Sequence, residues 1–445
     1  MSAPAAYPMA PVVERADRAD RADGLTARLT AVRRLAALIQ DRAIELEEAA
    51  VTALPFPRSV IRGDIALAVR RLEAYGSLAV RLDGRHPLGT VALCLPGNAI
   101  LSNPVATTAS SYLAGNRTVL RLPRRRAYWA DTVAGLLREA FGPQLELRNG
   151  TGASFIQGAL EDPAIQAVMV FGDDSWAKDY EAAARRTGTT FIFEGPGKDP
   201  FLVLAGADPV QAARAAVAGA FHNAGQACTA TERVYVLRHL YPRFVATARA
   251  AAAALTPGHP ADPATRIGPL DEAGADRVLR QLDEARAAGA ELLPAGSPWP
   301  VRIHDRRMLV IPPDIVLGAD HSMSLLREET FGPVLPVIAV DSAEEAIELA
   351  EDSPYGLAAT IYGGGPKVAE RLARSHGEVF RDETWLDRRR RGPVGPYGGR
   401  RASGWVWETR GGCFVHRDGP RLNVLEFSRP ANSDRTNRAE PDMEA

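Results

Sequence analysis

The stretch that decides the fold, residues 89–122, reads GTVALCLPGNAILSNPVATTASSYLAGNRTVLRL. Its first seven residues form a short, continuous apolar run, as expected of a strand buried on both faces. Pro96-Gly97-Asn98 then breaks the run, residues 103–114 have a helical pattern, and a second apolar run covers 118–122. Strand, helix and strand in this order predict a βαβ crossover and therefore a parallel sheet.

The same alternation extends in both directions from this stretch. Apolar periodicity predicts helices at 24–53, 64–75, 131–141, 209–223, 271–288 and 343–352, and strands at 167–171, 200–204, 233–237, 308–311, 334–340 and 358–362. We therefore predict an α/β fold with two Rossmann-like parallel-sheet domains, although the sequence contains no GxGxxG motif.

The expected division of the chain follows from these patterns. Residues 24–194 form a cofactor-binding domain, 195–385 a catalytic domain, and 386–427 a return segment with a small β oligomerisation element. Within that segment, 413–427 alternates apolar and polar residues like an edge strand, so we expect a homo-oligomer, either a dimer or a tetramer. Residues 1–23, which include the repeat RADRADRAD, and residues 428–445 are expected to be disordered tails.

Composition narrows the class of protein. The chain has 445 residues, of which 46% are apolar and 24% charged, as in ordinary globular proteins. It contains no run of eighteen apolar residues, which a membrane-spanning helix would need. A formal net charge of −1 gives no general attraction to nucleic acid or anionic lipid. Three widely spaced cysteines without a CxxC motif argue against a disulfide framework and against a zinc or other metal site. Without a signal-peptide pattern, these features favour a reducing cytoplasm.

One of the cysteines stands in a distinctive segment, FHNAGQACT at 221–229. Cys228 follows a glycine-containing turn between an expected helix and an expected strand. Exposed backbone N–H groups in such a turn favour the thiolate, which is the nucleophilic form of cysteine. For a single cysteine in an arbitrary protein, however, a buried structural role is the commoner explanation.

Other motifs in a fixed order change this interpretation. They are PGN at 96–98, EGPGKDP at 194–200, EETFGPV at 328–334, YGLA at 355–358, and PYGG at 396–399 followed by SG at 403–404. With these motifs, the chain from about residue 31 to residue 427 resembles the NAD(P)-dependent aldehyde dehydrogenase superfamily, whose members use a cysteine nucleophile.

The resemblance implies a role for each matching residue. Cys228 would add to the aldehyde as a thiohemiacetal, Asn98 would stabilise the oxyanion, and Glu194 would be the base that hydrolyses the thioester. Glu329 would hold the nicotinamide ribose, and Phe331 would pack beside the nicotinamide. Further cofactor contacts would come from Leu95, Pro96, Arg121, Arg124, Gly172, Asp173 and Gly195.

Several positions depart from the family pattern. Gly97 replaces a tryptophan and Pro196 replaces a glycine. Asp173 stands where a serine is usual, and its charge would repel the cofactor pyrophosphate unless it is neutralised or directed away. The run Arg121-Leu122-Pro123-Arg124 replaces Lys-Pro-Ser-Glu. Because Arg124, beside Arg125 and Arg126, can pair with a 2′-phosphate, this change favours NADP over NAD; an exposed basic turn is the alternative.

A run of four arginines, Arg388, Arg389, Arg390 and Arg391, lies just before the PYGG motif. In proteins like this the segment borders the substrate entrance, so the run predicts recognition of a carboxylate, phosphate or phosphonate. The alternative is a solvated surface run. The sequence thus predicts oxidation of an anionic aldehyde, such as a semialdehyde or a phosphonate aldehyde, to the acid. Two alternatives stay open: a CoA-acylating dehydrogenase, and a non-catalytic member that binds a nucleotide or a partner.

Overall fold

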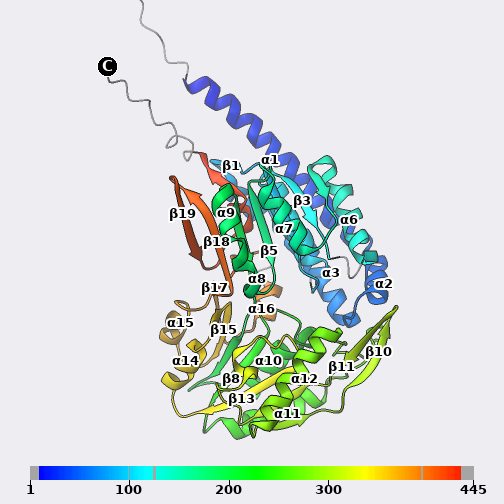
Figure 1. The fold of residues 1–445 in the computed structure, drawn as a ribbon, viewed down its shortest axis with the longest axis vertical. Helices are drawn as coiled ribbons and strands as arrows, with labels where there is room; N and C mark the ends of the chain where they lie inside the picture. Colours follow the sequence, from blue (N-terminus) through cyan, green and yellow to red (C-terminus); the bar gives the residue numbers. More distant parts are fainter. Residues whose placement is uncertain (1–9, 99, 124–126, 392–393, 432–445) are drawn as a thin grey trace, which may run out of the picture.

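The computed structural model describes residues 10–98, 100–123, 127–391 and 394–431. Two seven-stranded sheets organise these residues (Figure 1). The first sheet has the order β19 (Cys413–Asp418), β18 (Gly404–Arg410), β6 (Thr190–Glu194), β5 (Ala167–Phe171), β2 (Thr90–Cys94), β3 (Arg117–Arg121) and β4 (Leu145–Leu147). The second has the order β16 (Glu378–Arg381), β15 (Ala358–Tyr362), β7 (Asp199–Val203), β8 (Thr231–Leu237), β13 (Val334–Val340), β12 (Asp314–Leu317) and β9 (Glu291–Pro294).

Parallel pairing dominates both sheets, which confirms the predicted fold class. In the first sheet β6, β5, β2, β3 and β4 are parallel. In the second sheet only β9 runs antiparallel to its neighbour. The expected strands lie within about two residues of the observed ones, because buried strands are continuous apolar runs. The helices expected at 24–53 and 64–75 instead begin at residues 10 and 58, and the first is divided into α1 and α2.

Helices cover both faces of each sheet. One face of the first sheet packs against α1 (Ala10–Asp41), α2 (Ala43–Ala53), α3 (Arg58–Glu73), α5 (Ser102–Leu113) and α6 (Ala127–Phe141), and the other against α7 (Gly152–Glu161) and α9 (Glu181–Thr187). One face of the second sheet packs against α10 (Pro209–Phe221), α11 (Tyr241–Ala253) and α12 (Glu272–Ala287), and the other against α14 (Ala343–Glu351) and α15 (Pro366–Leu372). Each sheet is thus the middle layer of a three-layer α/β domain.

Further elements are shorter or lie outside the two large sheets. They are α4 (Gly76–Ala79), β1 (Arg85–Pro87), α8 (Asp174–Ala177), β10 (Trp299–Ile303), β11 (Arg306–Val310), α13 (Ser324–Arg327), β14 (Tyr355–Gly356), α16 (Trp385–Arg391), β17 (Arg400–Arg401), α17 (Asn423–Glu426) and β20 (Ser428–Pro430). Helix α16 lies between the two sheets (Figure 1). No helix of the described residues is long and apolar enough to cross a membrane.

The end of the chain corrects the expectation for 413–427. These residues do not form one unpaired strand, because β19 pairs with β18, which itself pairs with β6 in the first sheet (Figure 1). The chain then turns into α17, and β20 pairs with β1. Strand β19 is still the edge of its sheet, so an oligomer contact at this edge stays a prediction.

Part of each stretch expected to be a disordered tail belongs to a regular element. Helix α1 begins at Ala10, so residues 10–23 are helical, in keeping with the high helix propensity of their alanines and arginines. At the other end β20 includes residues 428–430, which were expected in the C-terminal tail. Residues 1–9 and 432–445 lie outside the described part of the chain.

Candidate active site

Cys228 lies in a tight turn between α10 and β8. After α10 ends, Asn223, Ala224 and Gly225 all have positive φ angles, of 55°, 54° and 74°. Two consecutive non-glycine residues in this region are unusual and store backbone strain, which is common at functional sites. The turn leaves Cys228 half-buried, three residues before the start of β8 in the second sheet.

Two backbone segments enclose this turn at distances that only glycine permits. A Cβ atom on Gly197 would lie 2.1 Å from the Cys228 carbonyl oxygen, and one on Gly225 would lie 2.1 Å from the carbonyl oxygen of Gly332. The predicted motifs around 194–200 and 328–334 therefore lie on either side of the cysteine turn. Segments far apart in the sequence form one site.

Among the described residues, the Cys228 thiol has one side-chain hydrogen-bond partner, the phenol of Tyr397. Its Sγ lies 2.9 Å from the Tyr397 hydroxyl oxygen. Burial raises the pKa of Cys228 to about 11, whereas the Tyr397 hydrogen bond and the Arg389 guanidinium lower it. Burial also raises the pKa of Tyr397 well above its usual value, so this phenol stays protonated and can donate to a thiolate.

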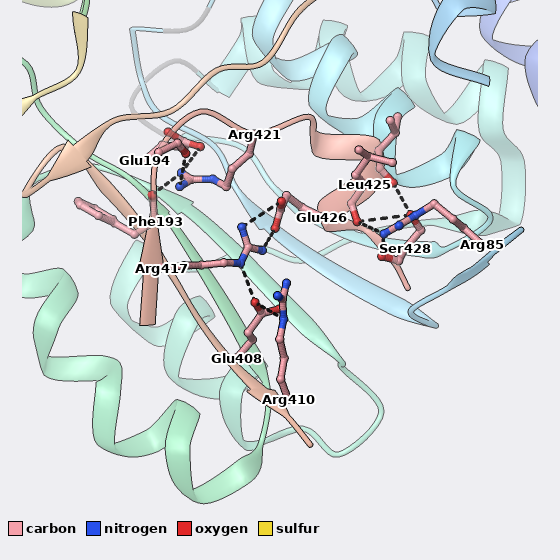
Figure 2. A network of polar contacts seen from close by, with 12 residues as sticks. Arg85, Phe193, Glu194, Glu408, Arg410, Arg417, Arg421, Leu425, Glu426 and Ser428 are labelled. Atoms are coloured by element: carbon pink, nitrogen blue, oxygen red, sulfur yellow. Dashed lines mark hydrogen bonds and ion pairs between the residues drawn. The ribbon is translucent and has the colours of Figure 1, made fainter. Parts of the chain in front are cut away.

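Glu194 ends β6 with its side chain inside the protein. Arg421 donates from Nη2 to Glu194 Oε1 at 2.7 Å, and both side chains are 2% exposed (Figure 2). Burial raises the pKa of Glu194, and the charge and hydrogen bond of Arg421 oppose that rise. After burial and the charge of Cys228, the charge of Glu194 also raises the pKa of Tyr397.

A buried ion pair fixes the segment that includes Glu329 and Phe331. Lys198 Nζ lies 2.7 Å from Glu232 Oε2 and donates to Thr330 Oγ1 at 2.9 Å. The Glu232 carboxylate accepts the Thr330 and Phe331 backbone N–H groups, each at 2.8 Å. These bonds hold Phe331 at a φ of 48°. Glu329 Oε1 in turn accepts the Gly197 N–H at 3.0 Å, and burial raises the Glu329 pKa to about 8.

A cavity of about 740 Å³ lies next to this site. Its volume is within the usual range for small-molecule and cofactor pockets. Its lining includes three predicted site residues, Asn98, Arg121 and Phe331. Gln226 of the cysteine turn and two further arginines, Arg277 and Arg306, also line it. The backbone of Gly150, Thr151 and Gly152, at the N-terminus of α7, completes one wall.

Comparisons with known proteins agree with this geometry. The sequence model of the aldehyde dehydrogenase family matches residues 11–414. The chain belongs to the aldehyde dehydrogenase family. It is 31% identical to a protein of Mycobacterium ulcerans named succinate-semialdehyde dehydrogenase [NADP(+)] 1, over 73% of this chain and 70% of that protein. It is 30% identical to a succinate-semialdehyde dehydrogenase [NADP(+)] of Deinococcus radiodurans, over 81% of this chain and 79% of that protein.

Solved structures extend the likeness to three dimensions. Lactaldehyde dehydrogenase from Escherichia coli superposes with a TM-score of 0.79 at 27% identity, covering 91% of this chain and 85% of the other. NADP-dependent glyceraldehyde-3-phosphate dehydrogenase from Bacillus halodurans, complexed with NADP, superposes with a TM-score of 0.78 at 25% identity and the same coverage. The predicted family and the predicted oxidoreductase class are thus confirmed.

The predicted cofactor residues of this aldehyde dehydrogenase have different surroundings. Leu95 is buried in the core, and Pro96 is half-buried beside the cavity-lining Gly97. Gly195 is buried, and its N–H donates to the Ser403 carbonyl at 2.9 Å. Arg124, Arg125 and Arg126 lie outside the described residues. Individual cofactor contacts therefore stay predictions.

Gly172 and Asp173 occupy the position where the family pattern has Gly-Ser. The exposed Asp173 caps α8, because its Oδ1 accepts the Ser175 N–H at 2.8 Å. A Cβ atom on Gly172 would lie 2.3 Å from the Trp176 ring. The Asp173 carboxylate thus caps α8, and its effect on the cofactor pyrophosphate stays a prediction.

Helix geometry separates the four arginines of α16. Only Arg389 is described with contacts toward the site: its guanidinium lies 4.4 Å from the centre of the Trp385 ring, and Nη2 lies 3.5 Å from Thr229 Oγ1. Arg388, Arg390 and Arg391 are exposed; Arg390 lies 3.8 Å from Asp387, and Arg391 pairs with Glu383. Successive residues of a helix point in different directions, so Arg389 alone of these four contacts the site side of α16, and substrate binding by the run stays a prediction.

Sequence reasoning missed two residues that contact the site. Tyr397 was quoted only as part of the PYGG motif, and Arg421 had no role at all. The signal for Tyr397 was its hydroxyl in a segment already assigned to the site. Arg421 gave no local signal, since its partner Glu194 is 227 residues away.

Proposed function

We propose that this aldehyde dehydrogenase oxidises a semialdehyde that bears a distal carboxylate, using NADP. The observation that carries the proposal is the position of Arg389 beside the Cys228 turn, because a guanidinium matches a carboxylate in charge and geometry. Relatives named succinate-semialdehyde dehydrogenase [NADP(+)] support both the substrate class and the cofactor.

The reaction begins with the Cys228 thiolate, which adds to the aldehyde carbon to give a thiohemiacetal. Asn98, half-buried after β2, and the Cys228 backbone N–H stabilise the oxygen anion; each such donor typically contributes about 3 kcal/mol. Bound NADP supplies the hydride acceptor that turns the thiohemiacetal into a thioester. Glu194 takes a proton from water, the water oxygen attacks the thioester carbonyl, and Cys228 leaves as thiolate.

The residues that line the cavity are chemically suited to bind a dinucleotide. Arg121, Arg277 and Arg306 bring positive charge to it, and Thr151 and Gly152 at the N-terminus of α7 line it. Both features favour phosphate groups. Phe331 offers an aromatic face for the nicotinamide, and Glu329 beside Gly197 is the carboxylate we assign to its ribose. The preference for NADP rests further on Arg124.

We also propose that the protein is a cytoplasmic homo-oligomer. The free edge of β19 supports self-association, because an edge strand can extend into a neighbour's sheet. Three cysteines without a disulfide support a reducing compartment.

An aldehyde panel tests the proposal. Succinate semialdehyde, a neutral aldehyde of similar length and a phosphonate aldehyde are each offered with NADP or NAD, and reduced nicotinamide is monitored. We expect the fastest turnover with succinate semialdehyde and NADP, and none with Cys228→Ala. Equal use of neutral and anionic aldehydes would contradict the substrate class, and turnover that requires added CoA would favour the acylating alternative.

A further inference from the structure

The ion pair between Glu194 and Arg421 uses the two carboxylate oxygens unequally. Oε1 accepts the Arg421 Nη2 hydrogen bond at 2.7 Å, while Oε2 is buried and has no hydrogen-bond partner among the described residues. A buried acceptor without a partner normally costs stability, and such groups often mark a site for water or for catalysis. One oxygen of the Glu194 carboxylate is therefore fixed by a hydrogen bond, and the other is available to accept a proton.

Arg421 itself is firmly held. Its guanidinium donates to the carbonyl oxygens of Gly419 at 3.1 Å and Phe193 at 3.2 Å (Figure 2). Its backbone N–H and C=O pair with the C=O and N–H of Tyr397 at 2.7 and 2.8 Å. Because Tyr397 contacts the Cys228 thiol, this short bridge fixes Arg421 relative to both the nucleophile and the base.

The segment that carries Arg421 is anchored on both sides. Arg417 pairs with Glu408 of β18 at 2.6 Å and also with Glu426 of α17 (Figure 2). Arg85 of β1 donates to the Ser428 hydroxyl at 2.7 Å. These contacts lie in the same C-terminal segment but do not include Glu194. They therefore offer a matched control for any effect of Arg421.

We propose that Arg421 is a positioning residue for the base, holding Glu194 by Oε1 so that it stays ionised and presents Oε2 to the hydrolytic water. This inference rests on the proposed function, in which Glu194 activates that water. Without a cationic partner, a carboxylate buried this deeply would take up a proton at neutral pH and could not accept another. In the step itself, the water oxygen bonds to the thioester carbon, its proton moves to Oε2, and the C–S bond breaks with its electron pair on the Cys228 sulfur.

The test uses Arg421→Gln, Arg421→Lys and the control Arg417→Gln in the full-length protein. The probe is 4-nitrophenyl acetate, which acylates a reactive thiol without cofactor or aldehyde. The nitrophenolate burst reports acylation of Cys228, and the later steady rate reports deacylation. Both are measured from acidic to alkaline pH, and circular dichroism checks folding.

We expect Arg421→Gln to keep the burst, to move the pH profile of deacylation about one to two units toward alkaline pH, and to slow deacylation by up to about tenfold at neutral pH, because losing an opposite charge raises a carboxyl pKa by about that amount. The rate should recover as the pH is raised. Arg421→Lys should lie between this variant and the wild type, and Arg417→Gln should keep the wild-type pH profile.

Each contrary result has a separate meaning. An unmoved pH profile in Arg421→Gln, or the same displacement in Arg417→Gln, overturns the inference and leaves the proposed function intact. No burst in the wild type would count against Cys228 as nucleophile, and thus against the proposed function. If Arg421→Gln does not fold, Arg421→Lys decides, since an unmoved profile in that variant overturns the inference.

Discussion

Replacing Tyr397 with phenylalanine removes a single oxygen atom from the neighbourhood of the nucleophile. That oxygen lies 2.9 Å from Cys228 Sγ. Because burial keeps the phenol protonated, its hydrogen bond is stronger to the thiolate than to the thiol. Tyr397→Phe keeps the ring and its packing, so the change isolates this one interaction.

The expected change in the rate of Cys228 modification follows from the free energy of this hydrogen bond. A hydrogen bond to a charged group contributes about 1.5 kcal/mol, which corresponds to about one pKa unit. The Cys228 pKa, already about 11, would rise further, and the thiolate fraction at any lower pH would fall about tenfold. A more basic thiolate is a better nucleophile and recovers roughly threefold, so the net rate of attack should fall about threefold.

The assay follows the rate at which an aromatic disulfide reagent modifies Cys228, without cofactor or aldehyde. Cys413→Ser is the common background because Cys413 is exposed, whereas Cys94 is buried. Tyr128→Phe, at an exposed position on α6, controls for loss of a phenol elsewhere. A rate equal to or higher than that of the background protein would refute the view that Tyr397 stabilises the thiolate.

Two further perturbations test the substrate site and the frame of the active site. Arg389→Gln should raise the KM for succinate semialdehyde about tenfold or more, with little effect on the KM for a neutral aldehyde. The surface variant Arg390→Gln should change neither KM. Equal effects of the two variants would show that the α16 arginines act only through general charge. Glu232→Gln leaves Lys198 buried without its partner and should lower the free energy of unfolding by about 3–5 kcal/mol in chemical denaturation. A loss below about 1 kcal/mol would show that the pair does not hold this segment together.

Local pattern was enough to predict the sheets, because a buried parallel strand is an apolar run that local sequence reveals. The cysteine turn and the motifs on either side of it were also predictable. In contrast, the return of β18 and β19 to the first sheet depends on pairing between distant segments, as in Gly404 opposite Glu194. The role of Arg421 could not be predicted for the same reason, since its partner Glu194 is far away in the sequence.

The arginine run also contains a helical signal that distinguishes its members. Trp385 and Arg389 are four residues apart, so on a helix they share one face. In the structure the Arg389 guanidinium lies over the Trp385 ring. Helical spacing would therefore have separated Arg389 from its three neighbours, whereas composition alone treats all four alike.

The most direct test of covalent catalysis is mass spectrometry of the Glu194→Gln variant after mixing with NADP and succinate semialdehyde. With the base removed, the thioester should form and persist, because hydride transfer precedes the step that needs Glu194. We predict a burst of NADPH stoichiometric with enzyme and a succinyl group on the peptide that contains Cys228. Continued NADPH formation with Cys228 unmodified would contradict the account.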